Sequence, residues 1–420
     1  MASLAQIEIQ KGRFFPKPKD YRKGEGYSFP PLAQFFDPSL YFVFCFSRGF
    51  GFVDYKRSSF GRNYSGPFHP ERQKDNLQVM KSWLLYLLFA VVFVLIGWFA
   101  NVAYHLPKNS NPIAQIKPRP LEKYSFENLA KANVESSEII IGKILKEDPK
   151  YTSYEFTFSF DPTLTGGAKK KVSGLVNVPK ATGQFPVVVM FRGYVDQKQY
   201  VIGEGTQRVG EVFAANGFIT IAPDFLGHGD SDTESSDIFE SRFQTYTTTA
   251  VLLKSVSAPA FAKATAGKWD NKNLFLWGHS NGGHLALAIL EITGEPYPTV
   301  LWAPNSAKFP YSIIYYLDEA SDEGKLVISK LAEFMGDYDV KNYSVRNFLD
   351  KVNPEAKIQV NQGLADDAIP VVWTDSLVKK LKDLKIDVSY LKYPGGNHNL
   401  TPLWNKAVEN ALVFFNAQIR

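Results

Sequence analysis

The chain contains one serine in a pattern that is typical of an activated nucleophile. Ser280 lies in Gly278-His279-Ser280-Asn281-Gly282, between an apolar run at 273–277 and a run of small and aliphatic residues at 283–290. The pattern G-x-S-x-G between a strand and a helix forms a nucleophile elbow, a tight turn that lifts the serine hydroxyl above a sheet. The two glycines leave room for this turn and for packing of the helix on the strand. We therefore predict that Ser280 is a nucleophile.

A serine hydroxyl needs a base within hydrogen-bond reach, and six histidines are available. His279 and His284 belong to the elbow and its helix, from which neither folds back easily onto Ser280. His398 follows a late strand, in a loop that contains two glycines and can place an imidazole over the elbow. We predict that His398 is the base. We expect a structural role for His228, which lies in a glycine-rich loop beside the site.

The base in turn needs an acid that orients it. Where a nucleophile elbow joins a strand to a helix in this way, the acid follows the serine and precedes the histidine along the chain. Asp366 and Asp367 lie in the loop at 363–370, directly after a predicted strand at 358–360. The residues alone leave both aspartates as candidates.

An oxyanion intermediate needs two hydrogen-bond donors. The backbone N–H of Asn281, directly after the nucleophile, is the first that we predict. The second comes from the loop after the strand at 185–191, and we assign it to Tyr194. The hydroxyl of Tyr194 is the alternative to its backbone N–H.

The elements that must position these residues alternate along the chain. Three strands that read as antiparallel come first, at 138–141, 154–158 and 171–179. Strands at 185–191, 218–223, 273–277, 299–302, 358–360 and 388–391 then alternate with helices at 206–216, 243–256, 283–290, 371–384 and 402–417. This order predicts an α/β fold with a mainly parallel sheet and helices on both faces. We interpret 258–267 as a surface loop, and the insertion at 307–352 as a lid or as a peripheral helix pair.

Residues 136–420 resemble an α/β-hydrolase of the prolyl oligopeptidase and dienelactone hydrolase-like enzymes. The resemblance lies in the elbow, in Asp224-Phe225-Leu226-Gly227-His228-Gly229, in Gly363–Pro370 and in Gly396-Asn397-His398. It implies the α/β-hydrolase fold and a serine hydrolase activity, and it favours Asp366, the first aspartate of the pair, as the catalytic acid. His279 and the sequence Arg192-Gly193-Tyr194 depart from the pattern of the peptidases, and no β-propeller is predicted.

Charge and cysteine content exclude other classes of protein. The net charge of +5 comes from residues 1–81, which hold 13 Lys and Arg against 7 Asp and Glu, whereas the remainder is nearly neutral. We therefore expect no nucleic acid partner. The single cysteine, Cys45, excludes an intramolecular disulfide and a cysteine-ligated metal, and we expect neither a metal nor a cofactor.

The N-terminal part predicts a membrane anchor. Residues 82–103 hold no charged side chain and are long enough to cross a bilayer, with aromatic residues near both ends. We predict a single-pass transmembrane signal anchor at 80–106, after a disordered extension at 1–79 and before a linker at 107–135. A cleaved signal peptide, a translation start at Met80 and a buried core helix are the alternatives. The catalytic domain is expected outside the cytoplasm.

The sequence thus predicts a membrane-anchored serine hydrolase that cleaves peptide or ester bonds through Ser280, Asp366 and His398. Its expected partners are a small ester or short peptide substrate and a lipid membrane, which it meets through 82–103. The alternatives are a carboxylesterase or lipase-like enzyme without peptidase activity, and a non-catalytic binding module, which would have lost a member of the triad.

Overall fold

The computed structural model describes residues 72–105, 117–319 and 322–420 of the protein. The disordered extension that we predict lies almost wholly outside these residues. The described residues belong to two units, one that holds residues 72–105 and a compact one from Pro118 to Arg420. Each unit is described by itself.

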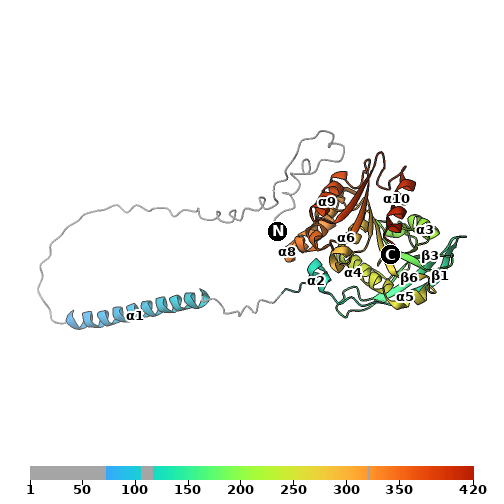
Figure 1. Cartoon of the computed structure of the whole chain (residues 1–420). Coiled ribbons are helices and arrows are strands. Elements are labelled where there is room, and N and C mark those ends of the chain that lie inside the picture. The colour runs from blue at the N-terminus through green and yellow to red at the C-terminus, as the bar shows by residue number, and fades with distance from the viewer. Residues whose placement is uncertain (1–71, 106–116, 320–321) are drawn as a thin grey trace. The chain divides into compact units, whose positions relative to one another are not determined.

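The first unit contains a single long helix, α1 (Arg72–His105), drawn in blue in Figure 1. Several of its large apolar side chains are exposed, among them Phe93 at 72% and Phe99 at 65%. Among the described residues, no helix has the length and hydropathy that crossing a membrane requires. The predicted segment 82–103 is therefore helical, but its role as a membrane span is not confirmed.

The second unit is built on a nine-stranded sheet in the order β1-β2-β3-β5-β4-β6-β7-β8-β9. The first three strands and the β3–β5 pair are antiparallel, and every later pair is parallel. The carboxyl ends of β4 to β9 therefore meet at one edge, where the predicted site residues follow. The strands are β1 (Ile140–Glu147), β2 (Tyr151–Phe160), β3 (Lys170–Pro179), β4 (Phe185–Phe191), β5 (Ile219–Pro223), β6 (Trp269–His279), β7 (Thr299–Trp302), β8 (Lys357–Gly363) and β9 (Asp387–Tyr393).

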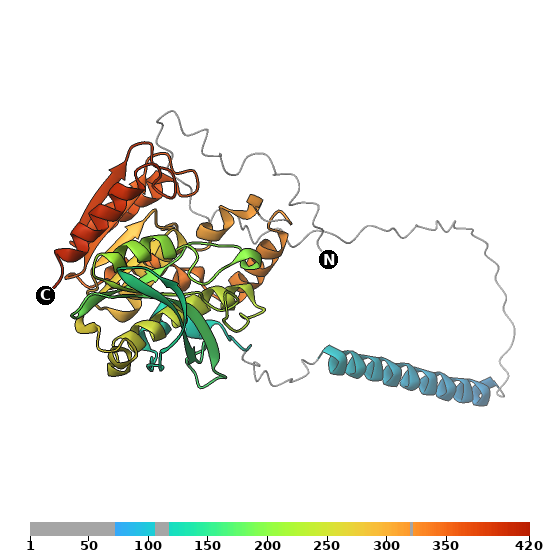
Figure 2. The same cartoon turned by 90° about the vertical axis from the view of Figure 1, so that its right-hand side faces the viewer.

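Helices cover both faces of this sheet, as Figures 1 and 2 show. One face packs against α3 (Gln207–Ala215) and α10 (Trp404–Asn416), whose buried residues form one apolar cluster with the strands. The other face packs against α4 (Ile238–Val256), α6 (Asn281–Thr293) and α9 (Val371–Asp383), which share a second cluster. The predicted α/β architecture is thus confirmed.

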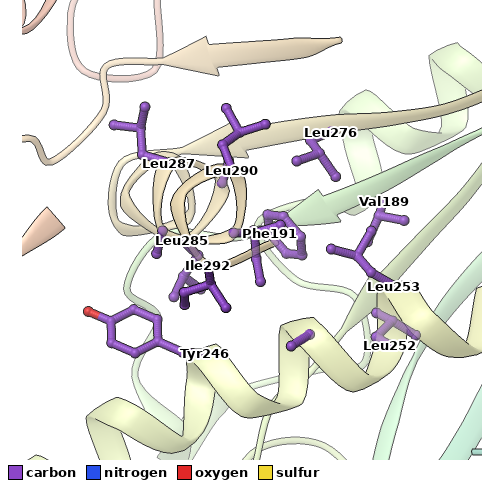
Figure 3. Packing of buried hydrophobic residues seen from close by; sticks show 14 of the residues in the cluster. Val189, Phe191, Tyr246, Leu252, Leu253, Leu276, Leu285, Leu287, Leu290 and Ile292 are labelled. Carbon is purple, nitrogen blue, oxygen red and sulfur yellow. The ribbon is translucent and has the colours of Figure 1, made fainter. Parts of the chain in front are cut away.

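The central strand β4 shows why the pattern of apolar residues gives two covered faces. Val187, Val189 and Phe191 belong to the cluster under α4 and α6, and Val188 and Met190 belong to the cluster under α3 and α10. Side chains alternate between the faces of a strand, so a strand buried on both sides is apolar throughout. Figure 3 shows Val189 and Phe191 among the side chains of α4 and α6.

Two segments that we predict as irregular contain short helices. The stretch 258–267, which we interpret as a loop, holds the short helix α5 (Pro259–Ala264), whose Phe261 is buried against Trp269. The predicted linker 107–135 is folded from Pro118 onward and contains α2 (Phe126–Lys131). Its apolar side chains join the main core, and Phe126 stacks on Phe348 with ring centroids 5.1 Å apart.

The insertion at 307–352 is mostly part of the core. Its helix α8 (Lys325–Asp337) buries Leu331 and Phe334, and Phe334 packs against Phe243 of α4 with ring centroids 5.9 Å apart. The short helix α7 (Tyr311–Ile314) packs against the same core through Ile313 and Ile314, and its Tyr311 packs on Trp373 of α9. The first part of the insertion contacts the loop that carries the two aspartates, because the Tyr316 hydroxyl donates to Ala368 O at 3.2 Å.

One buried acid on α6 lacks partners. Glu291 is 4% exposed, and neither of its carboxylate oxygens has a hydrogen-bond partner among the described residues. Burial and the charge of Asp350 raise the pKa of Glu291 well above its usual 4.5, whereas Arg346 acts in the opposite direction. An acid whose pKa rises on folding stabilises the native state only while it is protonated. This stabilisation is complete below pH 4.5 and is lost as the pH rises through the native pKa.

We therefore predict that Glu291→Gln stabilises the protein at pH 7 by about 1–3 kcal/mol, because the amide is buried without having to bind a proton, as the acid must. Thermal unfolding at pH 7 and pH 5 measures this, and the gain should be smaller at pH 5. Glu295→Gln, at an exposed position just after α6, is the matched control and should change little. A lower melting temperature of Glu291→Gln at pH 7 would show that the native carboxylate is ionised and paired.

Candidate active site

The turn between β6 and α6 has the strained geometry that the elbow requires. Ser280 has φ 56° and ψ −118°, a backbone conformation that residues other than glycine rarely adopt. Two backbone hydrogen bonds fix it, from Ser280 N–H to Trp302 O at 2.9 Å and from Asn305 N–H to Ser280 O at 2.9 Å. The end of β7 and the loop after it therefore hold the predicted nucleophile in place.

The glycines of the elbow are required by close backbone contacts. A Cβ on Gly282 would lie 1.9 Å from the carbonyl oxygen of Phe191, at the end of β4. A Cβ on Gly278 would lie 2.3 Å from the carbonyl oxygen of Gly282. Neither position has space for a side chain, which confirms the steric reason for the G-x-S-x-G spacing.

The structure brings two of the predicted site residues into direct contact. His398 Nδ1 lies 3.1 Å from both carboxylate oxygens of Asp366. The Asp366 side chain is fully buried, and that of His398 is 19% exposed. A carboxylate accepts hydrogen bonds, so Nδ1 carries the proton and Nε2 is left as the basic nitrogen.

This contact follows from the way in which the loops after β8 and β9 are joined. Ala365 N–H donates to Gly396 O at 2.8 Å, and Leu364 N–H donates to Tyr393 O at 3.0 Å. A Cβ on Gly363 would lie 2.3 Å from Gly396 O, so only glycine permits the approach. The two loops therefore form one unit that carries both Asp366 and His398.

The structure also separates the two aspartates. Asp366 accepts from the backbone N–H groups of Ala368 at 3.0 Å and Ile369 at 2.8 Å and from Gln362 Nε2 at 2.9 Å. Asp367 is exposed. Four donors, counting His398, surround the Asp366 carboxylate, and this is the environment of an acid that holds an imidazole in one orientation.

Gln362 is a site residue that the sequence reasoning missed. It is fully buried at the end of β8, and its Oε1 accepts from Thr374 Oγ1 of α9 at 2.7 Å. A signal was present, because Gln359, Asn361 and Gln362 place polar side chains in a strand that is buried within the sheet. Buried polar side chains are nearly always hydrogen-bonded, so such a pattern indicates a polar network.

His279 links the elbow to the loop that carries His398. Its Nε2 lies 3.0 Å from the carbonyl oxygen of His398, and the two rings lie 4.6 Å apart between centroids. Burial and the neighbouring His398 lower the pKa of His279 to about 4, so the ring is neutral at pH 7 and donates from Nε2. The elbow residue that departs from the peptidase pattern thus contacts the predicted base. No hydrogen bond of the Ser280 hydroxyl occurs among the described residues.

The loop after β4 lies directly against the elbow. A Cβ on Gly193 would lie 3.1 Å from Ser280 Cβ. Arg192 fixes this loop, because its guanidinium donates to Gly193 O at 3.0 Å and to Asp224 O at 2.9 Å. Tyr194 and Asn281, the predicted oxyanion donors, line one cavity of about 480 Å³, and Tyr194 is 85% exposed.

Two other histidines have structural partners. His228 lies within hydrogen-bond distance of Leu226 O at 3.2 Å and of Val195 O at 3.3 Å, in line with the structural role expected for it. His284 Nδ1 donates to Asn305 O at 3.2 Å, and its Nε2 accepts from the Tyr246 hydroxyl at 2.8 Å. Burial and Arg242 lower the pKa of His284 to about 3, so this buried ring is neutral.

The described residues contain no group of three or more His, Cys, Asp or Glu side chains that could hold a metal ion. The strained serine lies at the end of a central parallel strand, and the neighbouring His279 contacts the histidine of the histidine–aspartate pair. This arrangement is typical of one class of protein. The fold is the α/β-hydrolase fold, and the chain is a serine hydrolase.

Comparison with known proteins gives the family. Residues 207–419, which include the elbow and the loops of Asp366 and His398, match the prolyl oligopeptidase family (Peptidase_S9), and the chain belongs to this family. The resemblance seen in the sequence is thereby confirmed. No curated protein sequence matches the chain.

Solved structures with a similar fold include esterases and peptidases. Acetyl xylan esterase 1 from Thermoanaerobacterium sp. JW/SL YS485 is 18% identical, with 72% of this chain and 95% of that chain covered and a TM-score of 0.48. An S-formylglutathione hydrolase from Agrobacterium tumefaciens is 16% identical, with 66% and 99% covered and a TM-score of 0.44. A puromycin-hydrolyzing peptidase from Mycobacterium tuberculosis is 16% identical, with 67% and 39% covered and a TM-score of 0.42.

Proposed function

We propose that this serine hydrolase cleaves carboxylic esters and short peptide amides through Ser280, His398 and Asp366. The observation that carries the proposal is the contact of His398 Nδ1 with both oxygens of the buried Asp366 carboxylate, at 3.1 Å. The bond from His279 to the backbone of His398 ties this pair to the elbow. In this proposal Ser280 is the nucleophile, His398 is the base and Asp366 is the orienting acid, and all three follow strands whose carboxyl ends lie at one edge of the sheet.

In the first half of the reaction, Ser280 Oγ attacks the substrate carbonyl carbon while His398 Nε2 takes the hydroxyl proton. The carbonyl oxygen becomes an oxyanion, which the backbone N–H groups of Asn281 and Tyr194 stabilise. The bond to the leaving group then breaks, and His398 gives its proton to that group. An acyl ester of Ser280 remains.

In the second half, water attacks the acyl carbon while His398 Nε2 takes a proton from it. The bond to Ser280 Oγ breaks, the serine regains its proton from His398, and the free acid leaves. Asp366 stabilises the imidazolium that forms in each half. Amine leaving groups must be protonated as they leave, whereas many alkoxides depart unaided, so esters should react faster than amides.

The first test is covalent labelling of the nucleophile. A fluorophosphonate probe should label the wild-type protein at Ser280, and Ser280→Ala should abolish labelling and lower turnover of an acetyl ester roughly a millionfold. Peptide mapping by mass spectrometry locates the label. Ser257→Ala, an exposed serine after α4, is the matched control and should be labelled like the wild type. A label on another serine would overturn the assignment.

We also propose that residues 82–103 anchor the chain in a membrane, with the catalytic unit outside the cytoplasm. The exposed apolar side chains of α1 support this: Leu88 is 65% exposed and Leu95 is 51% exposed. Water does not favour such a surface, whereas a bilayer does.

For the membrane proposal, Leu88→Asp combined with Leu95→Asp should move the full chain from the carbonate-resistant membrane fraction to the soluble fraction. Each charge near the centre of a span costs about 2.5–3.5 kcal/mol. Leu326→Asp with Met335→Asp, two similarly exposed positions on α8, should leave the distribution unchanged. A C-terminal tag should be accessible to protease in intact cells. Recovery of the wild type in the soluble fraction would contradict the proposal.

A further inference from the structure

The cavity beside the elbow has a composition that points to its ligand. It has a volume of about 480 Å³ and lies between the loop after β4, the first half of α4 and the start of α6. Gly193, Tyr194 and Asn281 line it, so it begins at the proposed oxyanion donors. A substrate whose carbonyl is held there therefore extends into this cavity.

Arg242 of α4 lines the cavity with an incompletely satisfied guanidinium. It forms no ion pair with a carboxylate among the described residues, and its buried Nε has no hydrogen-bond partner there. Its neighbours are the Tyr246 hydroxyl and the neutral ring of His284. A buried donor without an acceptor costs free energy, and a ligand oxygen would remove that cost.

Other buried polar atoms of the cavity also lack partners. Arg192 is 7% exposed and has an unpartnered Nε, and Gln244 is 5% exposed and has an unpartnered Oε1. The remaining contacts of Arg192 are used to hold the loop after β4, and it stacks on Tyr200 at 4.9 Å. Lys198, which also lines the cavity, is exposed, so Arg242 is the partly buried cation of the cavity that is left for a ligand.

The acids that line the same cavity are engaged by protein donors. Asp196 accepts from the backbone N–H of Lys198 at 2.8 Å. Glu234 accepts from Gln197 at 2.7 Å and from the hydroxyl of Ser241. Lys198 also lines the cavity, so three cationic side chains stand against two carboxylates that already have partners. This balance favours an anionic ligand.

We propose that the cavity selects small esters or amides that carry a free carboxylate, and that Arg242 is the specificity-determining residue. The guanidinium binds the carboxylate of the substrate while the reacting carbonyl lies at the oxyanion donors. A guanidinium–carboxylate contact is directional and charge-assisted, which makes it selective against a neutral amide of the same shape. This inference rests on the proposed hydrolase function.

The test compares matched pairs of substrates. In the first pair, mono-4-nitrophenyl glutarate carries a carboxylate in its acyl part, and its glutaramate analogue carries a neutral amide there. In the second pair, 3-acetoxybenzoate carries the carboxylate in its leaving group, and 3-acetoxybenzamide carries a neutral amide there. In at least one pair, wild-type kcat/KM should be about ten- to hundredfold higher for the carboxylate. Arg242→Gln should bring that ratio close to one, and Arg242→Lys should keep part of the preference.

Lys254→Gln removes a charge from an exposed position on the same helix and is the control, which should keep the wild-type ratio. Thermal unfolding and fluorophosphonate labelling show whether Arg242→Gln is folded. If neither ester pair turns over, glutarate should still slow labelling of the wild type more than glutaramide does, in an Arg242-dependent way.

Equal rates for charged and neutral substrates, or an Arg242→Gln variant that lowers both alike, would overturn the inference and leave the hydrolase function standing. Absence of glutarate competition in a protein that labels but does not turn over either pair would also overturn it. A wild-type protein that the fluorophosphonate probe does not label would instead contradict the proposed function.

Discussion

The backbone conformation of Ser280 is the constraint on which the rest of the site depends. A non-glycine residue with φ 56° and ψ −118° costs on the order of 1–3 kcal/mol and persists only where its surroundings determine it. Here the surroundings are the ends of β4 and β7. Phe191 O leaves no space for a side chain at position 282, and Trp302 O and Asn305 N–H bind both sides of the serine peptide. The parallel sheet thus stores the strain that exposes the hydroxyl.

The histidine and its acid depend on a second constraint, the close approach of the loops after β8 and β9. Backbone hydrogen bonds join these loops, and the buried Gln362, which accepts from Thr374, donates to the Asp366 carboxylate. His279 then connects this unit to the elbow. Each group of the site is held by backbone or by buried side chains, which is what preorganisation requires.

Much of this arrangement could be predicted because it follows from local pattern and chain order. Strand, G-x-S-x-G and helix predict the elbow, and elimination among six histidines leaves His398. The pattern of residues alone does not distinguish Asp366 from Asp367, since both lie in one polar loop. The fold distinguishes them, because only the side chain of Asp366 is buried. Contacts between distant segments, such as His279 with His398 and Phe126 with Phe348, have no signature in sequence spacing. Residues 118–135 carry one local signal, the N-cap of α2 by Ser125, whereas the contacts of their apolar side chains with the core have no signature in sequence spacing.

The central claim is that the Asp366 carboxylate orients His398 as the base for Ser280. The most direct measurement is kcat for an acetyl ester with Asp366→Asn, beside Asp367→Asn as the matched neighbour. Since an amide in place of the carboxylate favours the wrong histidine tautomer, we predict a loss of about 10⁴ in kcat for Asp366→Asn with no change in melting temperature. Asp367→Asn, at an exposed position, should stay within a few-fold of the wild type. A large loss for Asp367→Asn with a small one for Asp366→Asn would contradict the account.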